Sequence, residues 1–84
     1  MDQPEVIAEM YKNPIEKVVA SLSMFKDKKR FDIRIFYQVD ARQFIPTRKG
    51  INLDVYSWQE FKEMIDKLDQ AIKGNKKVKG EYRA

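Results

Sequence analysis

Residues 25–37 read FKDKKRFDIRIFY, a segment in which aromatic residues are interleaved with lysines and arginines. Aromatic rings stack on unpaired bases while basic side chains contact phosphates, so this composition favours a single-stranded nucleic acid as ligand. Phe25 stands next to Lys26 and close to Lys28, where its ring could form a stacking surface or pack at the rim of the fold. Arg34 follows on the same segment, either as a solvated side chain or as part of a basic track with Lys28 and Arg30.

Catalytic chemistry finds little support in the sequence. The chain has no histidine and no cysteine, which removes the commonest general base, the commonest thiol nucleophile and most zinc ligands. A magnesium-dependent nuclease would need Asp27, Asp32, Asp40 and Asp54 to converge. We expect instead that Asp32 pairs with a neighbouring arginine and that the other three occupy turns or a helix cap. The sequence thus predicts a protein that is not an enzyme, with no metal and no cofactor.

Size and charge limit the organisation of the chain. Its 84 residues allow one domain, and without disulfides a domain of this size is expected to gain stability by self-association. The net charge is +4, with acidic residues concentrated at 2–16 and 60–69 and basic residues at 26–34, 48–49 and 73–83. This segregation is typical of one positive face, although a generally solvated surface would also fit. The acidic N-terminus and the absence of a long apolar run predict an intracellular protein that does not insert into a membrane.

Alternating apolar residues predict a β-meander over the first two thirds of the chain. We expect strands at 17–25 and 30–37, a third at 42–45 that stops before Pro46, and a fourth at 51–54 with Ile51 and Leu53 facing inward. The TRKG segment between the last two is expected to turn, with Gly50 at positive φ. Residues 1–16 are interpreted as an N-terminal arm or short helix, residues 17–74 as the domain, and residues 75–84 as a flexible basic tail.

One amphipathic helix is expected to follow the strands. Apolar residues recur at spacings of three and four from Trp58 onwards, with Asp54, or Ser57 together with Glu60, as candidate N-terminal caps and Gly74 at the C-terminal end. This stripe could simply cover the sheet of its own chain. It is, however, nearly as wide as the stripe of a helix that is buried on two sides. The sequence therefore favours a homodimer interface, formed by Trp58, Phe61, Ile65, Leu68 and Ile72.

Three segments carry a family resemblance: FDIRIFY, PTRKGINL and WQEFKEMIDKLDQAI. Their order and spacing, without gaps from about Val19 to Lys73, resemble the transcriptional positive-cofactor-four (PC4-like) family, whose members bind single-stranded DNA. The resemblance implies an α+β fold: a four-stranded curved antiparallel β-sheet followed by one C-terminal helix, pairing into a homodimer with channels for single strands. By position, the DNA-binding residues it implies are Phe25, Lys26, Lys28, Arg34, Tyr37, Arg48 and Lys49. Without the resemblance, Arg48 and Lys49 could be ordinary loop charges.

The chain departs from the family pattern at several positions. Tyr37 stands where the second stacking residue is usually tryptophan, and Ser23 and Val18 stand where basic residues are common. Asp27 replaces the glycine of a K-G-K turn and places a negative charge between two expected phosphate contacts. Eukaryotic members carry a long serine- and lysine-rich arm before the domain, whereas the arm here is short and acidic, which favours a bacterial or viral origin.

The leading hypothesis is a homodimer that binds single-stranded DNA without sequence preference and stabilises melted DNA during transcription, replication or recombination. The alternative is a protein-interaction adaptor that contacts a polymerase or another protein of these machineries through the helix face or the N-terminal arm. A repressor that inserts a β-ribbon into duplex DNA is a third hypothesis. The sequence does not distinguish DNA from RNA as the preferred single strand.

Overall fold

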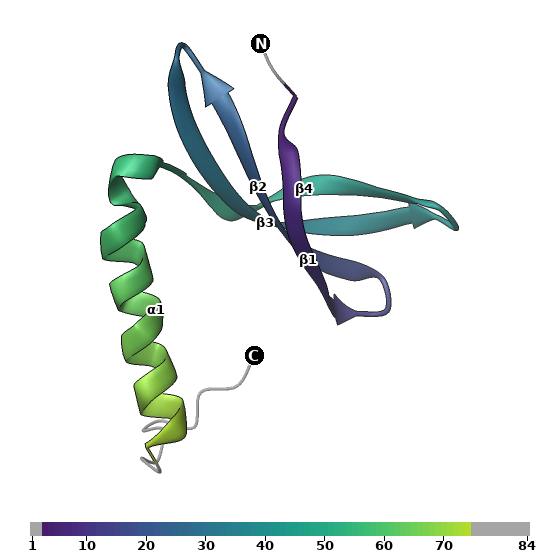
Figure 1. The fold of residues 1–84 in the computed structure, drawn as a ribbon. Coiled ribbons are helices and arrows are strands. Elements are labelled where there is room, and N and C mark those ends of the chain that lie inside the picture. Colours follow the sequence, from purple (N-terminus) through teal and green to yellow (C-terminus); the bar gives the residue numbers. More distant parts are fainter. Residues whose placement is uncertain (1–2, 75–84) are drawn as a thin grey trace.

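A computed structural model describes residues 3–74 as one antiparallel sheet followed by a helix (Figure 1). The four strands are β1 (Glu5–Asn13), β2 (Glu16–Phe25), β3 (Lys28–Asp40) and β4 (Gln43–Asp54). They lie in the order β1-β2-β3-β4, so each strand pairs with its neighbour in sequence. A 3₁₀ turn, η1 (Val55–Ser57), leads into α1 (Trp58–Lys73). The predicted α+β meander with a C-terminal helix is confirmed.

The N-terminal region differs from the sequence prediction. Residues 5–13 form strand β1, where an arm or short helix was expected, so the sheet begins well before Lys17. Val6, Ile7, Met10 and Tyr11 have helical spacing, but pairing with β2 satisfies the backbone of this segment along its length. Ile7 is an extra residue between the Val6–Ser21 and Ala8–Ala20 pairs, and this bulge interrupts the alternation that would have identified a strand.

The third and fourth expected strands are one continuous strand. Pro46 does not end β4 but pairs with Phe36, which is possible because β4 lies at the edge of the sheet. The TRKG segment does not turn the chain either; it forms a bulge within β4. Gly50 does not adopt the expected positive φ but pairs with Arg34, and a Cβ at Gly50 would lie 2.5 Å from the Ile33 carbonyl oxygen. Glycine is needed at this position for close approach of two strands.

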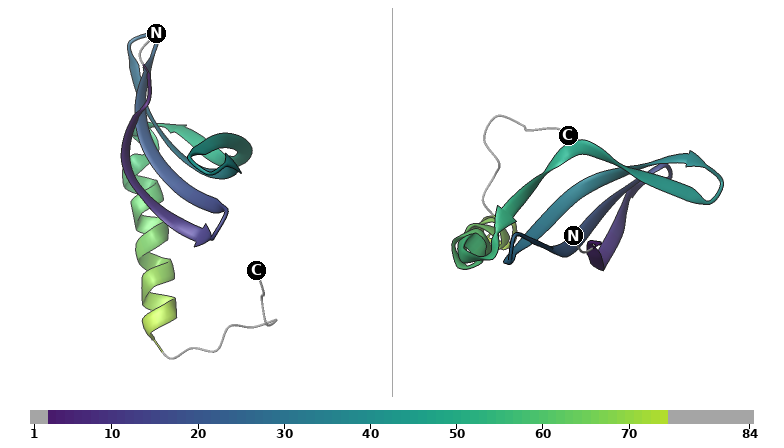
Figure 2. Two further views of the ribbon diagram at one scale, coloured as in Figure 1. Left: turned by 90° about the vertical axis from the view of Figure 1, so that its right-hand side faces the viewer. Right: turned by 90° about the horizontal axis from the view of Figure 1, so that it is seen from above.

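The sheet is strongly curved, as the two views in Figure 2 show. In a flat sheet the edge strands β1 and β4 would be about 14 Å apart. The ring centres of Tyr11 on β1 and Phe44 on β4 are only 6.2 Å apart, so the face that carries them is concave. Val19, on the same face, is 4% exposed. By strand register, we define the concave face by Tyr11, Lys17, Val19, Phe25, Lys28, Arg30, Asp32, Arg34, Phe36 and Phe44.

The opposite side of the sheet is apolar, and the helix starts there. We define this apolar face by Val18, Ala20, Leu22, Phe31, Ile33, Ile51 and Leu53, which share one side by register. Phe31 is 6% exposed because Trp58 and Phe61 pack on it, with ring centres 5.2 and 5.4 Å away. Beyond this point α1 extends away from the strands (Figure 1). Val19 and Phe31 are the only buried apolar residues within 3–74.

The start of the helix differs in detail from the expectation. The Asp54 carboxylate accepts a hydrogen bond of 2.9 Å from the Tyr56 backbone, and thus caps η1 rather than α1. Ser57 is the N-cap of α1 but makes no side-chain hydrogen bond there, so the capping box with Glu60 does not form. Gly74 follows the helix as its C-cap, as expected.

No helix within residues 3–74 has the length and apolar character that crossing a membrane would need. The predicted basic tail at 75–84 lies outside the described residues.

Candidate nucleic-acid interface

The hairpin between β2 and β3 brings three of the predicted DNA-binding residues together. Lys26 and Asp27 form its two-residue turn with φ of 52° and 63°, the combination that a type I′ turn requires. Phe25 and Lys28 face each other across the strand pair and are therefore on the same side of the sheet. The Lys26 ammonium lies 5.3 Å from the centre of the Phe25 ring, and 47% of Phe25 is exposed. One ring and two cations are thus accessible at the tip of the hairpin.

Arg34 is held in place by its neighbours on the concave face. Its guanidinium donates two hydrogen bonds to the Asp32 carboxylate, of 3.0 Å from Nε and 2.8 Å from Nη2, and a third of 3.0 Å from Nη1 to the Thr47 carbonyl. The Asp32 hydrogen bonds raise the pKa of Arg34 above its ordinary value. The expected pairing of Asp32 with an arginine is confirmed. Two of the five N–H donors of Arg34 remain for a ligand.

Arg30 belongs to the same hydrogen-bonded group. Its Nη2 donates to the Asn52 carbonyl over 3.3 Å, and its Nε donates to the Asn52 side-chain oxygen. The Asn52 amide in turn donates to Asp32 over 3.1 Å. Since these residues lie on β3 and β4, the network fixes both arginines relative to the strands. A fixed guanidinium loses less conformational entropy when it binds a phosphate than a mobile one.

A bulge in β4 carries two further predicted cations just before Gly50, the residue that pairs with Arg34. Ile35 alone on β3 lies opposite the three residues Thr47, Arg48 and Lys49, between the Pro46–Phe36 and Gly50–Arg34 pairs. The Thr47 hydroxyl stabilises this bulge, because it donates to the Ile35 carbonyl over 2.8 Å and accepts from the Lys49 backbone over 3.2 Å. Arg48 and Lys49 are both exposed. Lys49 lines a hollow together with Val18, Ile33 and Ile51 of the apolar face, so it lies toward the side of the sheet opposite to the Arg34 guanidinium.

Tyr37, like Lys49, is a predicted residue that the structure separates from Phe25 and Arg34. It pairs with Glu16 and Ile45, which puts it on the side of the sheet that carries Ile33, opposite to Arg34. Its side chain is 44% exposed. Phe25 and Arg34 therefore share one face, and Tyr37 does not share it with them.

A second aromatic and cationic group on the concave face was not predicted. The Lys17 ammonium lies 4.3 Å from the centre of the Phe44 ring and 5.4 Å from that of Tyr11, and it forms a salt bridge of 3.1 Å with Glu9. These residues come from β1, β2 and β4, and are far apart in sequence. This group was missed because the segment that contains Tyr11 was expected to form an arm or short helix and not a strand of the sheet.

The carboxylates considered for a magnesium site do not gather. Asp32 is engaged with Arg34, Asp54 caps η1, and Asp40 accepts a hydrogen bond of 3.0 Å from the Arg42 backbone in the β3–β4 turn. Within residues 3–74, no three acidic side chains lie close enough together to hold a metal ion.

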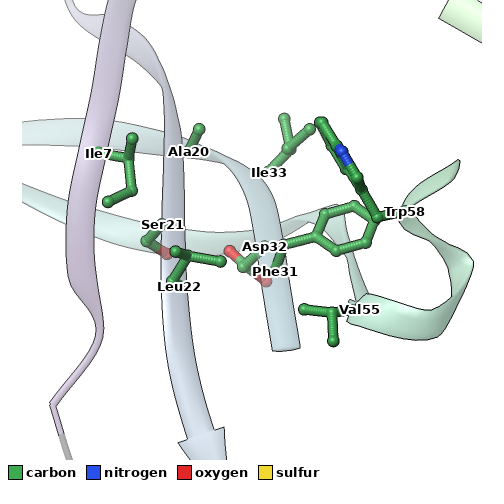
Figure 3. A pocket seen from close by; sticks show the side chains of 9 residues that line it. All are labelled: Ile7, Ala20, Ser21, Leu22, Phe31, Asp32, Ile33, Val55 and Trp58. Carbon is green, nitrogen blue, oxygen red and sulfur yellow. The ribbon is translucent and has the colours of Figure 1, made fainter. Parts of the chain in front are cut away.

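The residues expected at a dimer interface lie on α1 and are open to solvent over most of its length. Ile65, Leu68 and Ile72 are 43%, 55% and 77% exposed. Beside the first turn of the helix, the apolar face contains a hollow of about 420 Å³. Figure 3 shows its lining, with Trp58 and Val55 on one side and Ile7 and Ala20 on the other. The helix stripe and this hollow form one extended apolar surface in the single chain.

Comparison with known proteins found one matching family model and several similar chains. The family model described as Transcriptional Coactivator p15 (PC4) matches residues 12–64. An Arabidopsis thaliana protein named RNA polymerase II transcriptional coactivator KELP is 33% identical over 58 residues, which are 69% of this chain and 34% of that protein. A Drosophila melanogaster RNA polymerase II transcriptional coactivator is 33% identical over 51 residues, 61% of this chain and 46% of the relative. The chain thus matches less than half the length of these relatives.

Solved structures share the fold. A PC4 homologue from Burkholderia pseudomallei superposes with a TM-score of 0.74 at 18% identity, over 80% of this chain and 98% of the other. A bacteriophage T5 homologue of PC4, described as implicated in recombination-dependent DNA replication, gives 0.59 at 19% identity, over 83% and 82%. A MoSub1–DNA complex gives 0.54 at 22% identity, over 84% and 88%. At these identities the likeness establishes the arrangement of sheet and helix.

Proposed function

This chain belongs to the p15 (PC4) family of transcriptional coactivators, and from that premise we propose that it binds single-stranded DNA as a homodimer, without sequence preference and without catalysing a reaction. The observation that carries the proposal is the shared position of Phe25, Lys28 and Arg34 on one concave face. RNA or duplex DNA would bind more weakly to the same face.

The chemistry of this face suits an unpaired strand. The exposed ring of Phe25 offers a stacking surface, which contributes about 1 to 3 kcal/mol per base, and stacking does not depend on which base is present. The cations along β3 and β4 are spaced along the strand direction, so they would follow a sugar-phosphate backbone. Lys26, Lys28, Arg48 and Lys49 are exposed, and Arg34 supplies two free donors from a fixed position.

The proposed homodimer rests on the apolar surface. Only Val19 and Phe31 are buried apolar residues among residues 3–74, which is a small core for a domain of this size. Most of the α1 stripe and the hollow beside Trp58 would be covered if a second copy packed its helix there. Burial of Ile65, Leu68 and Ile72 in this way would supply the apolar contacts that a single chain lacks.

The DNA complex and the phage homologue named above support DNA as the ligand class, and together with the coactivator relatives they leave transcription, replication and recombination as candidate processes. All of these processes expose single strands inside the cell. We propose an intracellular location for the protein on this ground.

A second candidate function is contact with a protein of the transcription machinery. The observation that favours it is the exposed acidic surface of α1, with Glu60, Glu63, Asp66 and Asp69, which has no partner on the concave face. This surface would remain accessible when DNA is bound to the sheet, so the two functions are compatible.

The proposal is tested by titrating the protein against a labelled mixed-sequence single strand and against its duplex at two salt concentrations. We expect tighter binding of the single strand, and an affinity that falls as salt rises because phosphate contacts release counterions. Light scattering on the same sample should give twice the chain mass. Equal affinity for duplex and single strand, or none for either, would refute the DNA proposal, while a monomeric mass would refute only the homodimer.

A further inference from the structure

We propose that Tyr11 provides a second stacking surface for the bound strand, with Lys17 beside it as a phosphate contact; this inference rests on the proposed binding of single-stranded DNA. The family model begins at residue 12, so Tyr11 lies outside the segment that the family match covers. The resemblance alone would assign this role to Tyr37, which the structure places on the other face.

The strand register puts Tyr11 on the face that carries Phe25 and Arg34. Tyr11 pairs with Lys17, and Lys17 pairs with Phe36, two residues along β3 from Arg34. Side chains two residues apart on a strand point to the same side of the sheet. A strand of DNA that follows the concave face from Phe25 past Arg34 therefore reaches Tyr11.

The contacts of Tyr11 leave its ring available. The rings of Tyr11 and Phe44 meet edge to face, at an interplanar angle of 70°, and this arrangement does not stack one ring face on the other. Tyr11 is 62% exposed although its position is fixed by this contact. A ring that is held in place and still exposed can stack on a base with little loss of conformational entropy.

Lys17 supplies the matching charge. Its side chain is 22% exposed, and its ammonium is held by the salt bridge to Glu9 and by the two rings. An ammonium has three donors, so donors remain for a phosphate oxygen after the bond to Glu9. Ring and cation therefore occur together here, as they do at Phe25 and Lys26.

The distance between the two aromatic sites sets the length of DNA that can reach both. On β3, Lys28 lies opposite Phe25 and Phe36 lies opposite Lys17. Phe36 is eight positions along the strand from Lys28. This separation is about 26 Å along the strand. It corresponds to about eight nucleotides at a stacked spacing of about 3.4 Å, and to fewer if the DNA is extended.

The test compares variants of Tyr11 for binding to a labelled twelve-nucleotide single strand, which is long enough to reach both sites. Tyr11→Leu keeps an apolar side chain against Phe44 but removes the ring, and we expect it to weaken binding about 5- to 150-fold. Tyr11→Phe keeps the ring and should bind like the unchanged protein. Met10→Leu is the matched control, since Met10 is 64% exposed on the same strand but faces the other side.

The outcomes separate this inference from the proposed function. Wild-type affinity in Tyr11→Leu, together with loss of binding in Phe25→Ala, would overturn the role of Tyr11 and leave single-strand binding intact. An equal loss of affinity in Tyr11→Phe and Tyr11→Leu would overturn the stacking role, because Tyr11→Phe keeps the ring. If the unchanged protein does not bind single strands, the proposed function itself is refuted.

Thermal unfolding of each variant must match that of the unchanged protein. Lys17→Gln should lower the salt slope of single-strand binding by about 0.7, because one phosphate contact is lost.

Discussion

The two faces of the sheet differ in how far one chain satisfies them. On the concave face, charged groups other than Lys28 find partners within the chain: Arg34 bonds Asp32, Arg30 bonds Asn52, and Lys17 bonds Glu9. On the apolar face, α1 covers Phe31 with its first turns and then leaves the sheet. The polar contacts of the concave face are therefore made within one chain, whereas much of the apolar surface is exposed to water.

This difference indicates where each face obtains its stability. Hydrogen-bonded charges within a half-buried network contribute little net free energy but fix geometry, which suits a surface that must present donors to a ligand. Apolar surface contributes in proportion to the area removed from water, and here most of that area would be buried only in the proposed homodimer. A change on the apolar face should thus alter association and stability, and a change on the concave face should alter DNA affinity.

The largest effect is expected from a charge placed in the helix stripe. Leu68→Asp would put a carboxylate into the proposed interface, where an unpaired charge is costly to bury. We expect the dimer dissociation constant to rise at least about 100-fold, or about 2.7 kcal/mol. Sedimentation velocity over a concentration series measures this change.

The matched control is Gln70→Asp, which introduces the same charge on the outer side of α1. It should leave the dissociation constant within about twofold of the unchanged protein. Equal weakening by both substitutions would mean that the stripe is not the interface, and the contrast between the two faces would lose its basis.

A substitution on the concave face should have a smaller effect, confined to DNA binding. Arg34→Lys keeps the charge but removes the planar fork that Asp32 and the Thr47 carbonyl hold in place. We expect affinity for single-stranded DNA to fall about tenfold, or about 1.4 kcal/mol, with the salt slope unchanged. Fluorescence anisotropy at several salt concentrations separates the two quantities.

Lys49→Gln sharpens the comparison with a cation on the edge strand β4. Lys49 is exposed on the bulge and acts through its charge, so its loss should lower the salt slope by about 0.7. If Arg34→Lys lowered the slope in the same way, or left affinity unchanged, the fixed geometry of Arg34 would not matter for binding.

The sequence predicted the elements whose periodicity is regular. Strands β2 and β3 alternate without interruption, and α1 has one apolar stripe, so these elements were found, although β3 extends beyond the expected 30–37 at both ends. The prediction failed at bulges. Ile7 interrupts the alternation of β1, and the three residues opposite Ile35 made one strand look like two strands and a turn. A bulge depends on the partner strand, which local sequence does not reveal.

The residues of the candidate site also differ in whether local sequence could predict them. The grouping of Phe25, Lys26 and Lys28 could be predicted because they are neighbours in sequence at one hairpin. The contact between Tyr11 and Phe44 could not, because it depends on the curvature that brings the two edge strands together. The DNA-binding roles of all these residues remain predictions.

The smallest effect is expected at the turn that joins β2 and β3. Asp27 places a negative charge between Lys26 and Lys28, and its φ of 63° is one that asparagine and glycine adopt more readily than most residues. Asp27→Asn and Asp27→Gly both remove the charge, and we expect each to raise affinity for single-stranded DNA about two- to fivefold.

The two substitutions differ in what they do to the backbone, and this difference decides between charge and conformation. Glycine relieves the positive φ but also gains freedom in the unfolded chain, so the two effects nearly cancel and stability should change by less than about 0.5 kcal/mol. Asparagine leaves the backbone almost as it is. Equal gains in affinity would assign the effect to the charge at the hairpin tip, whereas a gain restricted to Asp27→Gly would assign it to the shape of the turn. Because neither change touches the apolar face, the dimer dissociation constant should stay the same in both.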